Sequence, residues 1–249
     1  MDLSGQVGAA GRPLEVLVQG RVSDAPLPAF SPYLRDLVGL DLAAGSLAAE
    51  GDLRRSDGPW QGRVRLTLGG AEVRPVPGAG TEARWVARAL RLLADERGRS
   101  DLEVSARADA PAAERLLEAA RVAVGAVYRP RGLSDDEARQ LLRDGVVPLG
   151  QAGLDPSGRG LSRSAAAWLE AIAAGLRPRP GARLRLCPVP GRAPDGGPET
   201  PPAPSTEGLV RDALVGAGGL PADRVLGCDA PASDASPGAP VQVSLEVAP

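Results

Sequence analysis

Hydrophobic and polar residues alternate with a period of two along most of residues 3–75, which is the pattern of β-strands with one buried face. Short polar turns such as Ser56-Asp57-Gly58 separate the alternating stretches, so neighbouring strands are expected to pair antiparallel. The main apolar positions expected to share one face are Leu14, Val16, Val18, Leu47, Leu53, Trp60, Val64, Leu66 and Leu68. This part of the chain therefore predicts an antiparallel sheet with one apolar side.

Two amphipathic helices are predicted after these strands. Residues 82–96 place apolar side chains at helical spacing, and Gly98 supplies the left-handed conformation in which helices commonly end. A strand is predicted over residues 102–108, and a second helix begins after Pro111. The helices are expected to cap the sheet.

The segment Arg129-Pro130-Arg131-Gly132 interrupts the second helical pattern and marks a domain boundary. We therefore predict a β-rich domain with capping helices over residues 1–130. Residues 131–249 are predicted to form a connector helix and a second domain. The fold class expected for the whole chain is α+β.

Strands and helices alternate in the second domain. Ser134 and Glu137 form a capping box, in which each side chain bonds the other residue's backbone N–H, and a further helix follows Ser162. The remaining predicted elements are strands at 146–149, 183–187, 224–228 and 241–247 and a helix at 206–217. The order βαβαββ predicts a small two-layer sandwich with proline-rich loops at 188–204 and 229–240.

The composition argues against several classes of function. The chain has no histidine, which removes the commonest general base, metal ligand and triad member together, so we expect no enzyme activity, no metal and no cofactor. The net charge is −2 and aromatic residues make up 2% of the chain, whereas a nucleic-acid-binding protein would show a basic face with interleaved aromatics. We therefore expect no nucleic-acid partner.

Two features leave alternatives open. Cys187 and Cys228 each lie at the end of a predicted strand, and either they form a disulfide or they are two buried thiols. The apolar side of the first sheet either packs entirely against the helices or stays partly open and accommodates acyl chains, because period-two alternation is the same in both cases.

Several short motifs of the first half resemble the C-terminal domain of AsmA-like envelope proteins, in an uncharacterised branch of that family. They are Leu3-Ser-Gly-Gln-Val, Val18-Gln-Gly-Arg-Val, Ser31-Pro-Tyr-Leu, Gly45-Ser-Leu, Leu66-Thr-Leu and Ala89-Leu-Arg-Leu-Leu-Ala-Asp-Glu-Arg-Gly. The resemblance implies a Gram-negative envelope protein with its β-rich body in the periplasm. It also implies attachment to the inner membrane through an N-terminal segment absent from this sequence, and a role in phospholipid transport along a hydrophobic surface.

The second half resembles an OmpA-like module, through Ser162 to Pro178, Leu184-Arg-Leu, Gly219-Leu-Pro-Ala-Asp-Arg-Val and Val241-Gln-Val-Ser-Leu. Members that bind peptidoglycan hold its peptide stem with an Asp and an Arg. Asp195 corresponds to the Asp, but Thr206 stands where the Arg is expected, and a hydroxyl cannot clamp a carboxylate as a guanidinium does.

Two functional hypotheses follow from the residues and the resemblance together. In the first, the protein is a non-enzymatic periplasmic component whose apolar sheet face contacts phospholipid acyl chains. In the second, it is a structural envelope module that docks to peptidoglycan or to an envelope protein through its OmpA-like half.

Overall fold

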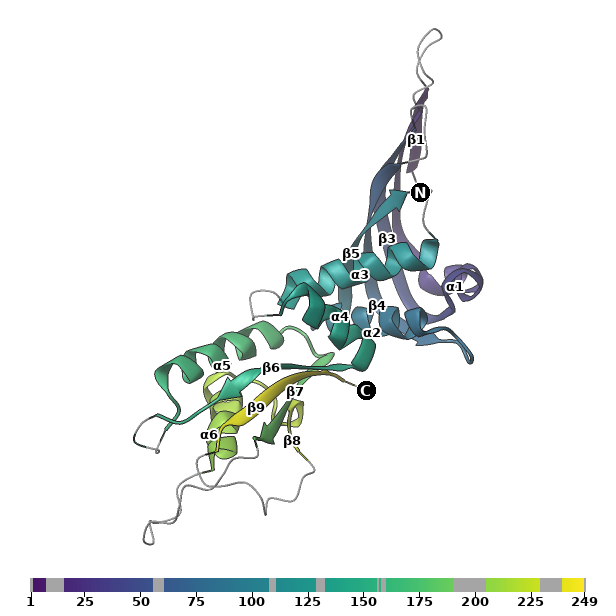
Figure 1. Ribbon diagram of the computed structural model, residues 1–249. Coiled ribbons are helices and arrows are strands. Elements are labelled where there is room, and N and C mark those ends of the chain that lie inside the picture. The colour runs from purple at the N-terminus through teal and green to yellow at the C-terminus, as the bar shows by residue number, and fades with distance from the viewer. Residues whose placement is uncertain are drawn as a thin grey trace. The chain divides into compact units, whose positions relative to one another are not determined.

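The computed structural model of the chain contains two compact units, Met1–Val127 and Tyr128–Pro249, whose boundary lies close to the one predicted between residues 130 and 131. The structure describes residues 2–7, 16–55, 61–107, 111–128, 133–155, 157, 160–189, 205–228 and 239–248. Both units combine helices with a sheet, and the α+β fold class is confirmed (Figure 1).

The first unit is built on a five-stranded meander in the order β1-β2-β3-β4-β5, with every neighbouring pair antiparallel. Its elements are β1 (Asp2–Val7), β2 (Val16–Pro26), η1 (Leu27–Phe30), α1 (Ser31–Val38), β3 (Leu40–Arg55), β4 (Gln61–Pro75), α2 (Thr81–Leu93), β5 (Arg99–Arg107) and α3 (Ala112–Tyr128). The predicted one-sided antiparallel sheet is therefore present.

Two bulged regions interrupt the meander near the helices. The β2–β3 register shifts between Val22 and Ala25, and Asp24 between them has a φ of +51°, a conformation that Asp tolerates better than most residues. The β3–β4 register shifts on both sides of Ala44, next to Gly45 with a φ of +111°. An added Cβ at Gly45 would lie 2.7 Å from the Gly69 carbonyl oxygen, so a larger residue does not fit there.

Helix α2 ends at Leu93, earlier than the predicted residue 96, because the next residues form their own turn. The Asp95 carboxylate accepts hydrogen bonds from the backbone N–H groups of Arg97 and Arg99, at 2.9 and 2.8 Å. Gly98 has a φ of +70°, and β5 begins at once. The residue expected to end the helix thus forms the turn that follows it.

The second unit contains a four-stranded mixed sheet in the order β6-β9-β7-β8. Its elements are α4 (Asp135–Asp144), β6 (Val146–Ala152), α5 (Arg163–Leu176), β7 (Ala182–Pro188), α6 (Thr206–Asp212), the π-helix η3 (Ala213–Ala217), the 3₁₀ turn η4 (Ala222–Arg224), β8 (Val225–Gly227) and β9 (Val241–Val247). Only β7 and β8 pair parallel. The strand and helix order after α4 is the predicted βαβαββ.

The predicted caps of this unit are confirmed. The Ser134 hydroxyl accepts from the Glu137 backbone N–H, and the Glu137 carboxylate accepts from the Ser134 backbone N–H at 2.7 Å. Ser162 caps α5 through the N–H of Ala165. The sequence thus located both helix starts through side-chain chemistry.

The core of the second unit lies between the sheet and its helices. The Trp168 ring of α5 is 3.2 Å from where a Cβ at Gly150 of β6 would lie. Leu169, Ile172, Leu184, Leu186, Val243 and Leu245 are fully buried. These side chains come from alternate strand positions and one stripe of α5, as expected for a two-layer arrangement.

Candidate functional site

The strand register places most of the predicted apolar residues on one side of the first sheet, which we call the apolar face. Val18 lies opposite Leu53 across β2 and β3, and Leu47 lies opposite Leu68 across β3 and β4. By the same alternation this face also carries Val16, Val64, Leu66, Leu102 and Val104. Residues from four strands therefore form one continuous apolar surface.

Helix α2 covers one end of the apolar face. The Ser100 hydroxyl of β5 donates to the backbone carbonyl oxygen of Leu90 in α2, at 3.2 Å. Near this contact Leu68 and Leu102 are 8% and 3% exposed. At this end the face is a packed core, which agrees with the alternative that the apolar side packs against the helices.

Beyond the helices the apolar face stays partly open. The strands continue past α2 and α3 in Figure 1. The partly exposed residues of the face are Val16, Val18, Leu47, Leu53, Val64, Leu66 and Val104. Gly20 and Gly51 lie opposite each other on this face, so backbone rather than side chain forms part of its surface. One surface is thus a packed core at one end and accessible at the other.

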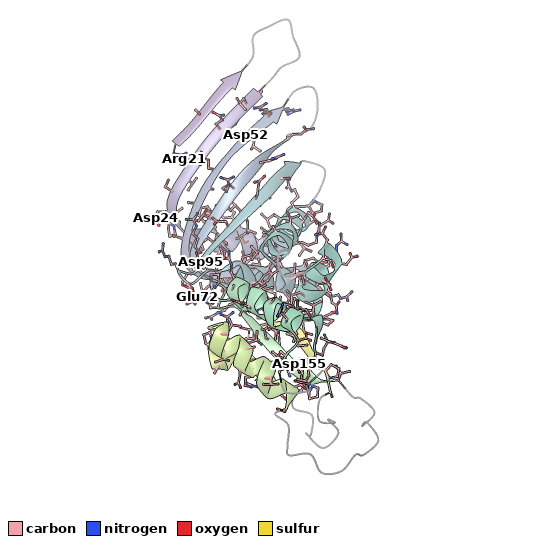
Figure 2. The ribbon with its side chains drawn as sticks, turned by 90° about the vertical axis from the view of Figure 1, so that its left-hand side faces the viewer. Arg21, Asp24, Asp52, Glu72, Asp95 and Asp155 are labelled. Carbon is pink, nitrogen blue, oxygen red and sulfur yellow. A yellow bond between two sulfur atoms is a disulfide. The ribbon has the colours of Figure 1, made fainter. Side chains whose placement is uncertain are left out.

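The opposite side of the same sheet, which we call the polar face, carries one row of charges that alternate in sign from strand to strand. Arg21, Glu50, Arg65 and Glu103 lie in register across β2, β3, β4 and β5. The Arg21 guanidinium donates to the Glu50 carboxylate at 2.7 Å. Figure 2 shows Arg21 and Asp52 on this sheet. Opposite charges on neighbouring strands stabilise the pairing modestly.

A hollow of about 670 Å³ lies over the polar face. It is lined by Ser4, Gln19, Gly20, Arg21, Glu50, Gly51, Asp52, Arg63, Arg65 and Glu103. Arginine and acidic side chains are equal in number among these residues, so the hollow has no net charge. Nothing in this balance selects an anionic or a cationic ligand.

Asp101 stands at the β5 end of the polar face. Partial burial raises the pKa of this carboxyl, but hydrogen bonds from the Thr67 hydroxyl and the Arg99 guanidinium outweigh that effect and leave the pKa below its ordinary value. Asp101 is therefore ionised at neutral pH and does not act as a proton donor there.

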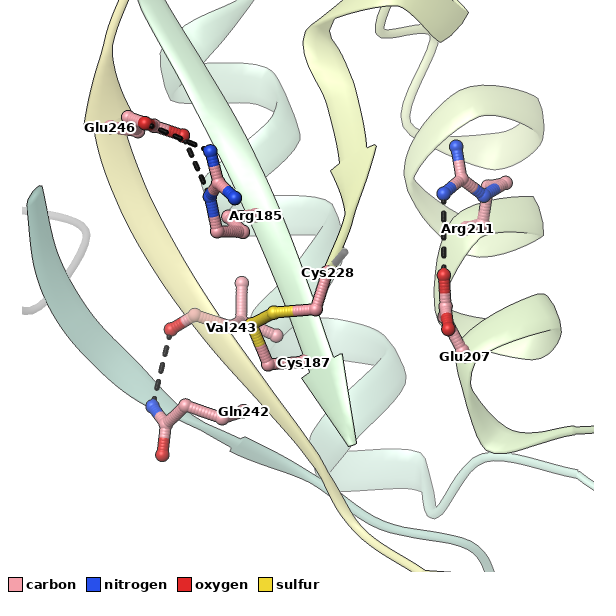
Figure 3. Close-up of a disulfide and its surroundings, with 8 residues drawn as sticks. All are labelled: Arg185, Cys187, Glu207, Arg211, Cys228, Gln242, Val243 and Glu246. Atoms are coloured by element: carbon pink, nitrogen blue, oxygen red, sulfur yellow. Dashed lines mark hydrogen bonds and ion pairs between the residues drawn. A yellow bond between two sulfur atoms is a disulfide. The ribbon is translucent and has the colours of Figure 1, made fainter. Parts of the chain in front are cut away.

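In the second unit, Cys187 and Cys228 are joined by a disulfide, with their Cα atoms 5.1 Å apart (Figure 3). The bond links the ends of β7 and β8, which pair through only three residues each. On the same side of the sheet the Arg185 guanidinium donates to both carboxylate oxygens of Glu246, at 3.0 and 3.1 Å. The cysteines therefore form the disulfide and are not two buried thiols.

The candidate peptidoglycan site is not assembled in the described residues. Asp195 lies outside them, as do Leu14 and Trp60 of the predicted apolar face. Thr206, at the position of the expected Arg, is 4% exposed, and its hydroxyl has no hydrogen-bond partner. A buried hydroxyl at this position cannot replace a guanidinium that reaches toward a ligand.

Two further kinds of feature, a metal site and a membrane-spanning helix, are absent from the described ranges. No group of three or more His, Cys, Asp or Glu residues is placed to hold a metal ion. No helix there combines the length and apolarity needed to cross a bilayer.

No protein-family model matches this sequence, and no curated protein matches it either.

Sequence reasoning missed two parts of the sheet. Leu102 and Val104 of β5 were not included in the predicted apolar face, although their period-two spacing signalled a strand. The alternating row of the polar face was also missed, because it depends on which residues of separate strands stand opposite each other. A single strand's pattern contains no such information.

Proposed function

We propose that this protein is a non-enzymatic component of a Gram-negative cell envelope, whose first unit contacts phospholipid acyl chains through the open part of its apolar face. The observation that carries the proposal is the partial exposure of Val18, Leu53, Val64 and Val104 on a surface that α2 covers only at its other end. A contiguous apolar surface that solvent partly reaches is a candidate binding surface.

Hydrophobic transfer makes an acyl chain a suitable ligand for this face. Burial of a methylene group gains about 0.8 kcal/mol, so a chain that buries half the surface of ten methylenes gains about 4 kcal/mol. That corresponds to a weak, reversible association, which suits a surface along which a lipid moves.

The disulfide supports a periplasmic location. Such bonds persist in oxidising compartments and are rare in the cytosol of mesophiles.

The second hypothesis, docking of the second unit to peptidoglycan, has no support from the described residues. Thr206 is buried and offers a hydroxyl where a guanidinium is needed. We therefore do not extend the proposal to the cell wall.

Adjacent residues of β2 provide a matched pair of variants for testing lipid contact. Val18 lies on the apolar face, whereas Gln19 lies on the polar face and is exposed. The full chain carrying Val18→Asp or Gln19→Asp is mixed with vesicles of phosphatidylethanolamine and phosphatidylglycerol that contain a fluorescent phospholipid. Transfer of the label to acceptor vesicles is then followed, and native mass spectrometry detects lipid that co-purifies.

The wild type and Gln19→Asp are expected to carry lipid equally. Val18→Asp is expected to transfer the labelled phospholipid at least about five-fold less, because a carboxylate placed in contact with an acyl chain costs more than 1 kcal/mol. Equal transfer by both variants, or a wild type that neither carries nor transfers lipid, contradicts the proposal.

A further inference from the structure

β5 is an edge strand that keeps one side free for hydrogen bonding. Its nine residues pair with β4 without a break, from Gly69 opposite Arg99 to Gln61 opposite Arg107. No strand in the described parts of the chain pairs with its other side. Within the described residues, the outer backbone edge of β5 is therefore unused beyond its first residues.

The free backbone groups can be assigned from the ladder. The Gly70 N–H donates to the Gly98 carbonyl at 2.9 Å, so Gly69 and Arg99 form the next, non-bonded pair. Both backbone groups of Arg99 instead bond Asp95. By alternation, Asp101, Glu103 and Ser105 direct their N–H and C=O groups away from β4. These three residues can form up to six hydrogen bonds with an added strand.

The other three sheet edges carry features that discourage pairing. β8 has three residues, and β1 has six with Gly5 among them. β6 contains Pro148, and its register shifts there. β5 has no proline, no glycine and no bulge. Natural sheets protect edges by such means, and a long regular edge without them is a template for another strand.

The side chains of β5 indicate which strand would fit. In one row of the polar face the charge sign alternates from strand to strand, and β5 ends this row with Glu103, opposite Arg65. Asp101 and Glu103 remain 55% and 49% exposed despite their partners Arg99 and Arg63. On the other face β5 carries the partly exposed Val104 next to the buried Leu102. A sixth strand with cationic side chains on one side and apolar ones on the other continues both faces.

We propose that the outer edge of β5 binds an extended segment of a partner protein, in which cationic and apolar residues alternate, as an added strand of the sheet. Main-chain hydrogen bonds from Asp101, Glu103 and Ser105 hold the segment, and the two carboxylates select its charge. The inference does not depend on lipid binding, since it uses the edge of the sheet and not its apolar face.

Ser105 allows the edge to be blocked with little change to the sheet. Because its N–H points away from β4, Ser105→Pro removes a donor from the free edge and no bond from the ladder. Ser105→Ala keeps that donor and serves as the control. Glu103→Arg changes the charge that the edge presents while leaving its backbone intact.

The probes are two fluorescent peptides of equal length, one of alternating Arg and Val residues and the other of alternating Glu and Val residues. Binding to the full chain is measured by fluorescence anisotropy, circular dichroism checks the fold of each variant, and sedimentation equilibrium gives the oligomeric state.

We expect the wild type and Ser105→Ala to bind the Arg-Val peptide at least about tenfold more tightly than the Glu-Val peptide, because like charges opposite each other on adjacent strands repel. Ser105→Pro should lose about tenfold in affinity, and Glu103→Arg should reduce or reverse the preference. If Ser105→Pro fails to fold, the Glu103→Arg result decides.

Equal binding of both peptides by the wild type, or undiminished binding by a folded Ser105→Pro variant, overturns the proposal. A wild-type dimer that Ser105→Pro dissociates also overturns it, because the occupant of the edge would then be a second copy of this chain.

Discussion

The Ser100 hydroxyl donates to the carbonyl oxygen of Leu90 over 3.2 Å, and this bond fastens β5 to α2 where the apolar face is covered. Ser100 is 3% exposed, so its hydroxyl needs a partner within the protein. Two residues farther along the same strand and face, Leu102 is still buried, whereas Val104 is partly exposed. The boundary between core and open surface therefore runs between these two side chains.

That boundary predicts unequal costs for two truncations on one strand. Leu102→Ala should destabilise the first unit by about 3 kcal/mol, because it removes buried methyl groups and leaves a cavity. Val104→Ala should cost about 1 kcal/mol or less, since part of the side chain already contacts solvent. Hydrogen exchange of peptides from β4 and β5, measured by mass spectrometry, gives the destabilisation caused by each substitution. Similar costs would mean that the open part of the face is covered after all.

Arg224 is predicted to hold together the second unit. Arg224 is 8% exposed, and its guanidinium donates to the carbonyl oxygens of Leu176, Arg179 and Ala182, at 2.9, 2.6 and 2.7 Å. Burial lowers the pKa of Arg224, but the group stays charged at any physiological pH. Arg224→Met should cost about 3 kcal/mol because a buried guanidinium that bonds three backbone carbonyls is lost.

The control for Arg224 is Arg211→Met, which removes a partly exposed guanidinium that donates to the Val225 carbonyl at 2.6 Å. That variant should cost about 1 kcal/mol. Urea unfolding gives the free energy of unfolding of both variants. Hydrogen exchange in α5 and β7 then shows whether the loss of stability lies in the second unit. Equal losses of unfolding free energy in the two variants would show that the burial of Arg224 does not increase its contribution to stability.

Removal of the disulfide should weaken the second unit and leave the first unchanged. The bond closes a loop with a sequence separation of 41 residues, for which chain entropy predicts about 4 kcal/mol. Both cysteines of the chain lie in the second unit. Thermal unfolding of a Cys187→Ala/Cys228→Ala variant, with the reduced wild type beside it, tests this. A change in hydrogen exchange in β2 or β3 would contradict it.

The capping box of α4 predicts a dependence of stability on pH. The Ser134 hydroxyl and N–H donate to Glu137 and hold the pKa of that carboxyl below its ordinary value. A lowered folded-state pKa stabilises the protein above the ordinary glutamate value of about 4.3, and the effect is lost as the pH falls through the folded-state pKa.

Ser134→Ala should therefore cost about 1 kcal/mol at pH 7, and the difference from wild type should shrink as the pH falls below about 4. Urea unfolding midpoints at a series of pH values measure the difference, and Ser164→Ala, whose hydroxyl lies 3.2 Å from that of Ser162, controls for loss of a serine elsewhere in the unit. A gap that stays constant down to pH 3 would assign the effect to the hydroxyl alone.

Local chemistry made part of this fold predictable from sequence. The Ser134–Glu137 box located the start of α4, and the alternation over Val241–Val247 matched β9 at both ends. These features depend on residues close together in the chain. In the same way, the spacing of Val18 and Val64 gave the correct sides of two strands, because side-chain direction alternates whatever the partner strand is.

Other features depend on contacts between distant residues and were not predictable. The row from Arg21 to Glu103 requires the register of four strands. The extent to which α2 covers the apolar face depends on how a helix packs on a sheet, which the amphipathic pattern does not determine. The change from α6 to the π-helix at Ala213 has no signal in the residues that form it.

The position of β9 has a consequence for how the second unit is made. β9 is the last of its four strands in sequence, yet it lies between β6 and β7 at the centre of the sheet. On the ribosome, β6 and β7 emerge long before the strand that joins them, so the unit can mature only once translation has passed Val247. A premature stop before Val241 would leave two unjoined strands for chaperones and proteases, not a slightly shortened domain.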